Sequence, residues 1–420
     1  MGKLIFLCYL VYVVTYFGRM NYSSCIVAIT SELGCANSEA GLVSSYFFAA
    51  YAVGQIVNGL LADRVNNKLM VAGSLFCSAA INLLMPFMPG ITAMKYLWLL
   101  NGVVQSVMWT NLVGIVSVMV PIDLIPRSMV VLITSSNLGT LTVYGYSSLC
   151  LSISTWRTLF YTAFVLLALA GAVWSVFVTR LERHMVWSDP GDTEPAPQTS
   201  VAASMKQLRY IFAAGGLGFA VMLSLLNGAH REGIMSWIPS FAKDTYGISE
   251  SFSVLVAILL PVVNFFGSPL NRLVSKRLGK LGNGVFSATF FYVISLALMI
   301  LLRCFAWSGL AGACLLFASL TLLMTAINAA IVGVIPVEMA AYGCSASLTG
   351  FLNFGYCLGS ALSTYGLGYI SDRLGWASVL DALWIAGVAA VLIGGAGSFF
   401  WTRFLKRLSA GPYKQAASQS

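Results

Sequence analysis

Long apolar runs separated by short polar segments dominate the chain. Twelve of these runs are long enough to cross a bilayer as α-helices, which takes about 20 residues each. Backbone polar groups facing lipid must be satisfied within their own segment, so helices are the expected structure. We predict spans at about residues 4–30, 39–62, 68–88, 93–119, 128–150, 157–180, 208–238, 251–272, 283–303, 307–334, 343–370 and 376–403.

The composition agrees with this pattern. Of the 420 residues, 59% are hydrophobic and 9% are charged, which is too few charges to cover the surface of a water-soluble protein of this size. The first apolar run is too long for a cleavable signal peptide. We therefore predict an all-α, multi-pass protein of the cell inner (plasma) membrane, with the lipid bilayer as its surroundings.

The basic residues are distributed unevenly among the predicted loops. With the N-terminus placed in the cytoplasm, the inner loops and the tail hold most of them: Arg64, Lys68, Arg127, Arg180, Arg183, Lys206, Arg209, Arg272, Lys276, Arg277, Lys280, Arg403, Lys406, Arg407 and Lys414. The predicted outer loops hold only Lys95, Arg157, Lys243, Arg303 and Arg373. The positive-inside rule then predicts that both termini are cytoplasmic. Because topology explains the net charge of +9, we expect no nucleic-acid partner.

One long polar segment divides the predicted spans into two sets of six. It runs from Arg180 to Arg209 and contains a stretch rich in proline, glycine and acidic residues at 188–197, which is typical of a flexible linker. We therefore expect six-helix bundles at residues 1–180 and 208–403, a cytoplasmic linker at 181–207 and a cytoplasmic tail at 404–420.

The two sets of spans also repeat one another. The separation that carries Arg19 onto Arg231 also carries the turn Asp63–Arg64 onto Ser275–Lys276. Parallel repeats of this kind, related by an axis along the membrane normal, are a known transporter arrangement. In that arrangement the first and seventh helices face each other, so we expect the two arginines to converge on one ligand.

The first predicted span carries a charge where charges are rare. An arginine inside a span keeps its proton and is unfavourable in lipid, so it indicates function by default. Tyr12, Tyr16 and Arg19 follow one another at steps of four and three and therefore share one helix face. Two phenols and a permanent cation on one face suit an anion. The alternative is an arginine that pairs with a distant carboxylate to lock two helices together.

The seventh predicted span contains His230, Arg231 and Glu232 in succession. Successive helical residues point about 100° apart, so the three side chains cannot all face one cavity. If Arg231 faces the pore, its neighbours flank it. Glu232 is then either a carboxylate that couples transport to protons or a structural counter-ion of the arginine. His230 is the weaker candidate for proton coupling.

The turn after the second span reads GLLADRVNNK at residues 59–68. It resembles the signature loop of the major facilitator superfamily. That resemblance implies a fold of twelve transmembrane helices in two pseudo-symmetric six-helix bundles. It also implies a gating role for Asp63 and Arg64, in which an acid at a helix end holds a basic group in one conformation and releases it in the other.

Further motifs extend through both halves of the chain. They are Tyr12, Tyr16, Arg19 and Asn21 in the first span, Ala50-Tyr51 in the second, Gly102-x-x-Gln105-x-x-x-Trp109 in the fourth, Arg231-x-Gly233-x-x-x-Trp237-x-Pro239 in the seventh, and Thr349-Gly350-Phe351 with Gly355-Tyr356 in the eleventh. Together they resemble the organophosphate–phosphate antiporter family, which includes the glycerol-3-phosphate and hexose-6-phosphate transporters. The resemblance implies an anion clamp of two arginines in a cavity lined by polar side chains. The clamp would be Arg19 and Arg231, and the lining would be Tyr12, Tyr16, Tyr51, Gln105 and Tyr356.

The chain departs from that family at several positions. Met20 and Gln55 stand where the family often has lysines, Ser136 replaces a histidine, and Ala326 replaces a tyrosine. The predicted site thus keeps the two arginines and loses neighbouring cationic and proton-accepting groups.

We therefore expect a monomeric secondary active transporter that exchanges an organophosphate for inorganic phosphate by alternating access. One alternative is a proton-coupled symporter of sugar acids or other carboxylates, and another is a non-transporting membrane sensor of the same ligands. Neither a nucleophile–base set nor an ATP-binding motif is present, so we do not expect an enzyme. The nine cysteines lack the spacing of a metal site, and we expect neither metal nor cofactor.

Overall fold

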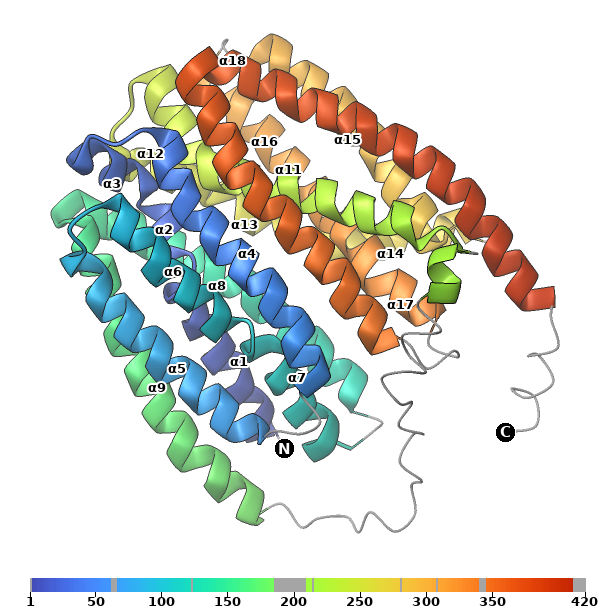
Figure 1. Ribbon diagram of the computed structural model, residues 1–420, viewed down its shortest axis with the longest axis horizontal. Coiled ribbons are helices and arrows are strands. Elements are labelled where there is room, and N and C mark those ends of the chain that lie inside the picture. The colour runs from blue at the N-terminus through green and yellow to red at the C-terminus, as the bar shows by residue number, and fades with distance from the viewer. Residues whose placement is uncertain are drawn as a thin grey trace.

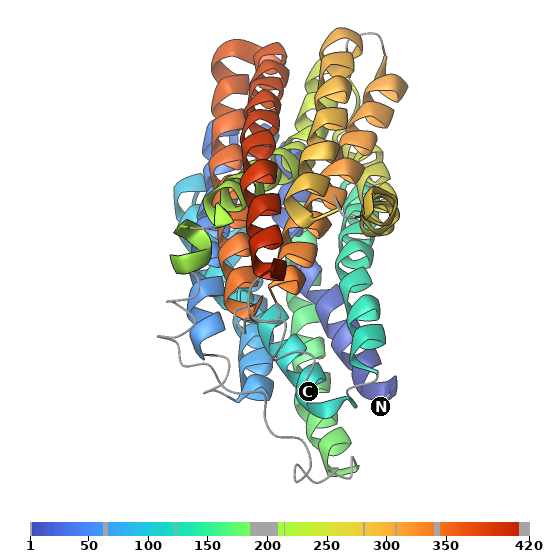
Figure 2. The same ribbon diagram turned by 90° about the vertical axis from the view of Figure 1, so that its right-hand side faces the viewer.

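A computed structural model describes residues 2–61, 66–121, 124–184, 209–213, 215–279, 282–306, 309–339 and 345–410. The described elements are helical and form twelve membrane-length rods in two bundles of six, which lie side by side in Figure 1. Seen from a direction turned by 90°, most rods run along one common direction (Figure 2). The predicted all-α fold of two six-helix bundles is confirmed.

The first half of the molecule contains six rods formed by residues 2–184. In chain order these are α1 (Gly2–Phe17) with α2 (Asn21–Ser24) and α3 (Ile26–Leu33); α4 (Asn37–Leu61); α5 (Asn67–Leu84) with the 3-10 helix η1 (Met85–Phe87); α6 (Ile91–Gln105) with α7 (Met108–Met119); α8 (Ile125–Ile153); and α9 (Trp156–His184).

The second half repeats this arrangement. Its rods are α11 (Leu217–Tyr246); α12 (Glu250–Ala257) with α13 (Leu259–Asn264) and α14 (Gly267–Leu278); α15 (Gly284–Phe305); α16 (Leu310–Asn328) with the π-helix η4 (Ala329–Val334) and α17 (Ile335–Glu338); and two rods within α18 (Ser345–Ala410), which bends at Gly375. Most of the predicted linker, from residue 185 onward, lies outside the described residues.

The seventh rod differs from its predicted span of residues 208–238. Helix α11 begins at Leu217, because Gly216 before it adopts a left-handed backbone conformation with φ 70°. The helix continues past Pro239 to Tyr246. Consequently Arg231 lies at the middle of its rod, whereas the predicted span placed it near one end.

Hydropathy alone identifies fewer rods than the structure contains. Eight described segments are long and apolar enough to cross a membrane, and one of them, Leu348–Leu408, spans both rods of α18. Helices α8 and α11 are not among the eight. Helix α11 carries His230, Arg231 and Glu232 within its 30 residues, so the rods with weak hydropathy include one that carries the candidate site.

The two halves are joined at the end of the molecule opposite the start of α1. We call this the far end; it holds the α3–α4 and α11–α12 connections and the bend at Gly375 (Figure 1). Here the Asp372 carboxylate of α18 accepts hydrogen bonds from the backbone N–H groups of Asn37, at 3.0 Å, and Ser38, at 2.7 Å. These residues open α4, where a negative charge stabilises a helix.

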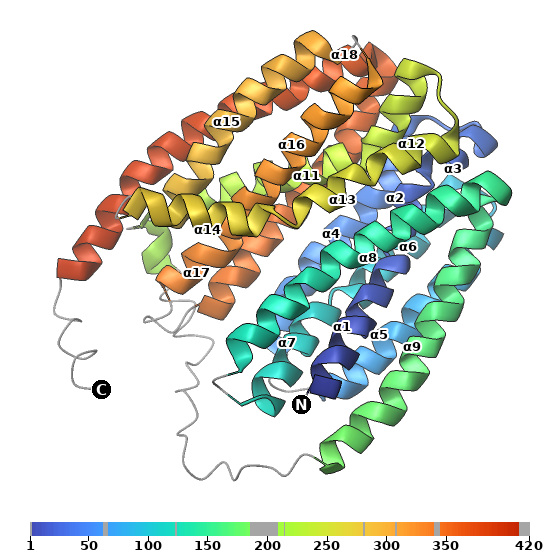
Figure 3. The same ribbon diagram turned by 180° about the vertical axis from the view of Figure 1, so that it is seen from behind.

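A second contact between the halves lies on the face of the molecule that is turned away from the viewer in Figure 1. Helices α12 and α13 cross α8 there, as Figure 3 shows. The Ser148 hydroxyl donates to the Ser251 carbonyl at 2.8 Å, and the Tyr144 hydroxyl donates to the Met235 carbonyl at 3.2 Å. These bonds tie the fifth rod to the seventh and eighth.

Candidate functional site

Arg19 lies in the turn between α1 and α2, where the first rod is interrupted. The carbonyl of Gly18 leaves the helical hydrogen-bond pattern and is held by two amide side chains. Asn101 Nδ2 donates to it at 2.7 Å and Asn82 Nδ2 at 3.5 Å. Because these amides come from α6 and α5, neighbouring helices hold the turn that presents Arg19.

The Arg19 guanidinium lies among aromatic rings. Its Cζ is 4.6 Å from the ring centroid of Tyr51, 5.6 Å from that of Tyr16 and 5.7 Å from that of Phe47. Cation–π contacts of this kind stabilise by about 0.5–2 kcal/mol each. Within the described residues, Arg19 makes no ion pair, and its buried Nε has no hydrogen-bond partner.

Three of the four predicted tyrosines belong to an aromatic wall around Arg19 in the first half of the molecule. Tyr12 packs edge-on against Tyr16, with centroids 5.5 Å apart, and also contacts Trp109 at 5.2 Å. Tyr51 stacks on Phe47 with centroids 5.8 Å apart. Phe47 was not predicted as a site residue, although its position one helical turn before Tyr51 was a signal that could have found it.

Gln105 does not join the aromatic wall. Its Nε2 donates to the Ser78 hydroxyl at 2.9 Å and to the Thr15 carbonyl at 3.3 Å, and its side chain is buried. In this conformation the amide nitrogen braces α1 against α5 and is not available to a ligand.

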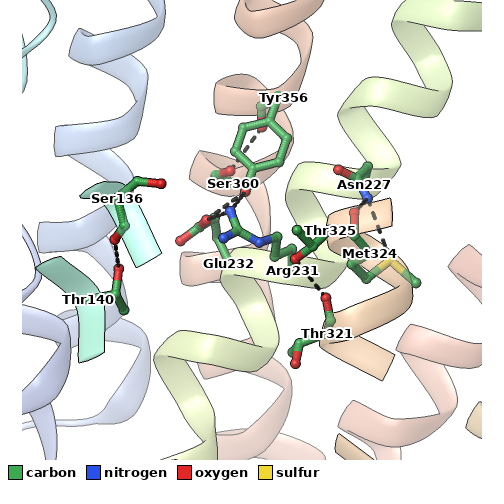
Figure 4. Close-up of polar contacts among 10 residues, drawn as sticks. All are labelled: Ser136, Thr140, Asn227, Arg231, Glu232, Thr321, Met324, Thr325, Tyr356 and Ser360. Atoms are coloured by element: carbon green, nitrogen blue, oxygen red, sulfur yellow. Dashed lines mark hydrogen bonds and ion pairs between the residues drawn. The ribbon is translucent and has the colours of Figure 1, made fainter. Parts of the chain in front are cut away.

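The second half contributes a compact polar cluster from α11 and α18 (Figure 4). Arg231 Nη1 donates to the Tyr356 hydroxyl at 2.8 Å and to Glu232 Oε1 at 3.1 Å. The Tyr356 hydroxyl in turn donates to the same Glu232 oxygen at 2.6 Å. Arg231 Nε is buried without a partner among the described residues.

Glu232 connects the two halves of the site electrostatically. Its carboxylate interacts with both Arg19 and Arg231, and Tyr16 of α1 also interacts with both arginines. The two arginines, one from each half, therefore lie within electrostatic reach of the same carboxylate. Two permanent cations and one carboxylate leave this site with a single net positive charge when Glu232 is ionised.

His230 lies outside this cluster. Its ring is buried in the contact between α11 and α18, with Nδ1 2.7 Å from the Leu226 carbonyl and Nε2 3.0 Å from the Leu383 carbonyl. The step of about 100° between successive helical residues separates it from Glu232. Of the two predicted proton-coupling candidates, only Glu232 contacts an arginine.

Two positions where the chain departs from the antiporter family carry uncharged side chains that bond to backbone carbonyls. Gln55 is buried and donates to the Ser106 carbonyl at 2.9 Å. The Ser136 hydroxyl of α8 donates to the Ile133 carbonyl of the same helix at 2.8 Å. The Ser136 carbonyl accepts a hydrogen bond from the Thr140 hydroxyl, which Figure 4 shows. The predicted gating residues Asp63 and Arg64 lie outside the described residues.

Fold and site together define a class of protein. It is a polytopic membrane protein made of two similar six-helix halves, and the first rod of each half carries an arginine that interacts electrostatically with Glu232. Residues 8–364 match the sequence profile of the Major Facilitator Superfamily. The chain belongs to this family.

Relatives with known names include several transporters. The glycerol-3-phosphate transporter of Bacillus subtilis (strain 168) is 24% identical over 385 residues, which cover 86% of this chain and 84% of that protein. The voltage-gated purine nucleotide uniporter SLC17A9 of Mus musculus is 26% identical over 272 residues, or 62% of this chain. The chain spans about 60% of the length of that relative. The membrane sensor protein UhpC of Escherichia coli (strain K12) is 28% identical over 95 residues, 23% of this chain and 22% of that one.

Solved structures share the fold at low sequence identity. A point mutant of the nucleoside transporter NupG has a TM-score of 0.75 at 12% identity, covering 94% of this chain and 99% of that one. A bacterial homolog of the human lysosomal transporter Spinster has a TM-score of 0.69 at 13% identity, covering 96% and 97%. The predicted resemblance to the major facilitator superfamily and to the organophosphate antiporter type is confirmed.

Proposed function

We propose that the protein is a secondary active transporter that exchanges an organophosphate for inorganic phosphate by alternating access. The pair Arg19 and Arg231 carries this proposal. Each comes from a different half of the molecule, and each has a buried Nε without a partner among the described residues. Guanidinium groups match the paired oxygens of phosphate or carboxylate in a two-pronged geometry. The name of the Bacillus relative, a glycerol-3-phosphate transporter, supports a phosphate ester as the cargo.

The two arginines also supply a reason for exchange. Without an anion, two permanent cations and one carboxylate share a buried site, and like charges repel strongly where water is scarce. An anion that bridges both arginines removes this repulsion and draws the halves together. A ligand that binds one conformation better shifts the equilibrium toward it. The empty protein then changes slowly between its inward-open and outward-open conformations. An exchanger requires this, because only the loaded protein should change conformation rapidly.

We place both termini in the cytoplasm of a cell whose inner or plasma membrane holds the protein. The far end then faces outward, and the described conformation is the one closed to the outside. Asp372 and the first turn of α4 form part of that closure. In this proposal the contacts at the far end separate when the site becomes accessible from the outside.

Transport in proteoliposomes tests the proposal. Vesicles containing the purified protein are loaded with inorganic phosphate or left without it, and uptake of labelled glycerol 3-phosphate is measured without a pH gradient. We expect uptake only with internal phosphate. Equal uptake into phosphate-free vesicles would exclude obligatory exchange, and absence of both binding and uptake would exclude the proposed substrate.

Proton-coupled symport of sugar acids or other carboxylates is the second candidate. The contact of Glu232 with Arg231 and Tyr356 favours it, because a carboxylate at the site can carry a proton. Uptake of a labelled sugar acid driven by an imposed inward proton gradient, and lost in Glu232→Gln, would support this candidate. The sensor interpretation is less favoured, because the match to UhpC covers 95 residues.

A further inference from the structure

Glu232 occupies the donors that an anion would use. Its Oε1 receives hydrogen bonds from Arg231 Nη1 at 3.1 Å and from the Tyr356 hydroxyl at 2.6 Å. The Glu232 side chain is 5% exposed, whereas that of Arg231 is 20% exposed. A ligand that reaches Arg231 therefore competes with Glu232 for the same two donors.

The net charge of the site determines which anions can displace Glu232. A monoanion neutralises the single net positive charge while Glu232 stays ionised. A dianion, such as a phosphate ester above its second pKa of about 6, leaves one excess negative charge. An uncompensated charge in a buried site is strongly unfavourable, and a group there changes its protonation state instead. The dianion therefore requires a proton.

The groups facing Glu232 identify where this proton goes. Arg231 and Tyr356 are hydrogen-bonded to Glu232, and Arg19 of α1, Tyr144 of α8 and Cys357 of α18 lie within electrostatic reach of it. Guanidinium groups are already protonated, and neutral phenols and thiols do not accept a proton. Among these groups the carboxylate is the acceptor.

Ionisable groups on the other helices packed against α11 lie elsewhere. Glu250 of α12 pairs with Lys243 at 2.9 Å at the far end, and the Tyr22 hydroxyl of α2 donates to the Ala40 carbonyl at 2.9 Å. At the far end, too, Glu32 of α3 accepts a hydrogen bond from Arg157 at 2.9 Å. None of these side chains is bonded to Glu232.

We propose that Glu232 is a resident counter-ion that a dianionic phosphate ester displaces from Arg231 and Tyr356, and that the released carboxylate then takes up one proton from solvent. No covalent bond changes apart from the O–H bond that this proton forms with a Glu232 oxygen, and the donors of Arg231 and Tyr356 pass to the ester. The inference rests on the proposed function. Under this inference each bound substrate carries one net negative charge across the membrane. The substrate is either a monoanion or a dianion accompanied by one proton. Exchange of ester for phosphate then moves no net charge.

Calorimetry measures the proton directly. Glycerol 3-phosphate is titrated into purified protein at pH 8 in two buffers of different ionisation enthalpy, and the difference in heat gives the protons taken up per ligand. We expect about one proton for the wild type and none for Glu232→Gln. By linkage, wild-type affinity falls about tenfold per pH unit above neutrality, whereas the affinity of Glu232→Gln does not change with pH.

Two further variants complete the experiment. Glu232→Asp keeps a carboxylate, so proton uptake is expected to persist even where affinity falls. Asp381→Asn removes another carboxylate from an arginine pair, the exposed Arg303–Asp381 contact at 2.6 Å, and is expected to behave as wild type.

The outcomes separate this inference from the function on which it rests. Wild-type binding without proton uptake, or proton uptake that persists in Glu232→Gln, would overturn the inference and leave anion exchange standing. If Glu232→Asp bound glycerol 3-phosphate without taking up a proton, the inference would also be overturned. If glycerol 3-phosphate bound neither the wild type nor any of the variants, both the inference and the proposed function would be overturned.

Discussion

Gly41 of α4 lies directly against the backbone carbonyl of Thr364 of α18, so closely that a Cβ on Gly41 would overlap the carbonyl oxygen. The same oxygen accepts a hydrogen bond from Trp237 Nε1 at 3.0 Å. The second, seventh and eleventh rods therefore meet at one point near the far end. The contact fixes backbone against backbone, so the two halves can close there only when position 41 has no side chain.

Substituting Gly41 by alanine is therefore expected to open the far end. The added methyl group forces α4 away from α18 and shifts the population toward the conformation open on that side. Spin labels at Glu39 and Arg373, two positions in opposite halves at this end, report this as a longer distance in a background without reactive native cysteines. Gly73→Ala is the matched control, since no atom lies within 4 Å of a Cβ there. Unchanged distances in Gly41→Ala would contradict the close contact.

Asp372→Asn is expected to act in the same direction with a smaller effect. The carboxylate accepts from two N–H groups at the start of α4, and a charge at a helix N-terminus contributes about 0.3–1 kcal/mol. Its loss should change the ratio of closed to open far ends by up to about fivefold, measured with the same pair of labels. Asp244→Asn removes a carboxylate that accepts from Trp376 within the second half at 3.0 Å. If both variants shift the ratio equally, Asp372 is not a latch between the halves.

Lysine at position 19 or 231 is expected to abolish high-affinity anion binding. An ammonium group keeps the charge but cannot reproduce the two-pronged guanidinium geometry, and each lost charged hydrogen bond weakens binding by about 1.5–3 kcal/mol. Affinity should fall roughly tenfold or more, seen as a smaller rise in Tm on adding glycerol 3-phosphate or inorganic phosphate. Arg303→Lys changes an exposed arginine paired with Asp381 and should leave that rise unchanged. Wild-type affinity in either site variant would refute the two-arginine site.

Features set by periodicity along one helix were predictable from the sequence. Apolar runs predicted most of the rods, and steps of three and four placed Tyr16 on the side of Arg19, where the structure also has it. The step of about 100° predicted that His230 and Glu232 diverge, and they do.

Features that depend on partners from other helices were not predictable. The first span was expected to be one continuous helix, but it breaks at Gly18, whose carbonyl bonds to amides from α5 and α6. The resemblance to the antiporter family placed Gln105 in the lining of the cavity, and in the structure its amide nitrogen bonds to α1 and α5. Periodicity indicates which face a side chain occupies, but not which neighbour takes its hydrogen bonds. Those partners become visible only when the helices are packed.

Asn101 offers a test of whether the turn positions Arg19. Its Nδ2 holds the Gly18 carbonyl at 2.7 Å, and its Oδ1 accepts from the Ser78 hydroxyl at 2.8 Å. Asn101→Ala leaves these buried groups short of partners, which costs about 1–3 kcal/mol, so a lower Tm is expected. Because the turn also loosens, affinity for glycerol 3-phosphate should fall as well. Asn111→Ala, which removes an amide bonded to the Val107 carbonyl of its own rod at 2.6 Å, is expected to leave affinity unchanged. A lower Tm with wild-type affinity in Asn101→Ala would show that the bond to Gly18 stabilises the bundle without orienting Arg19.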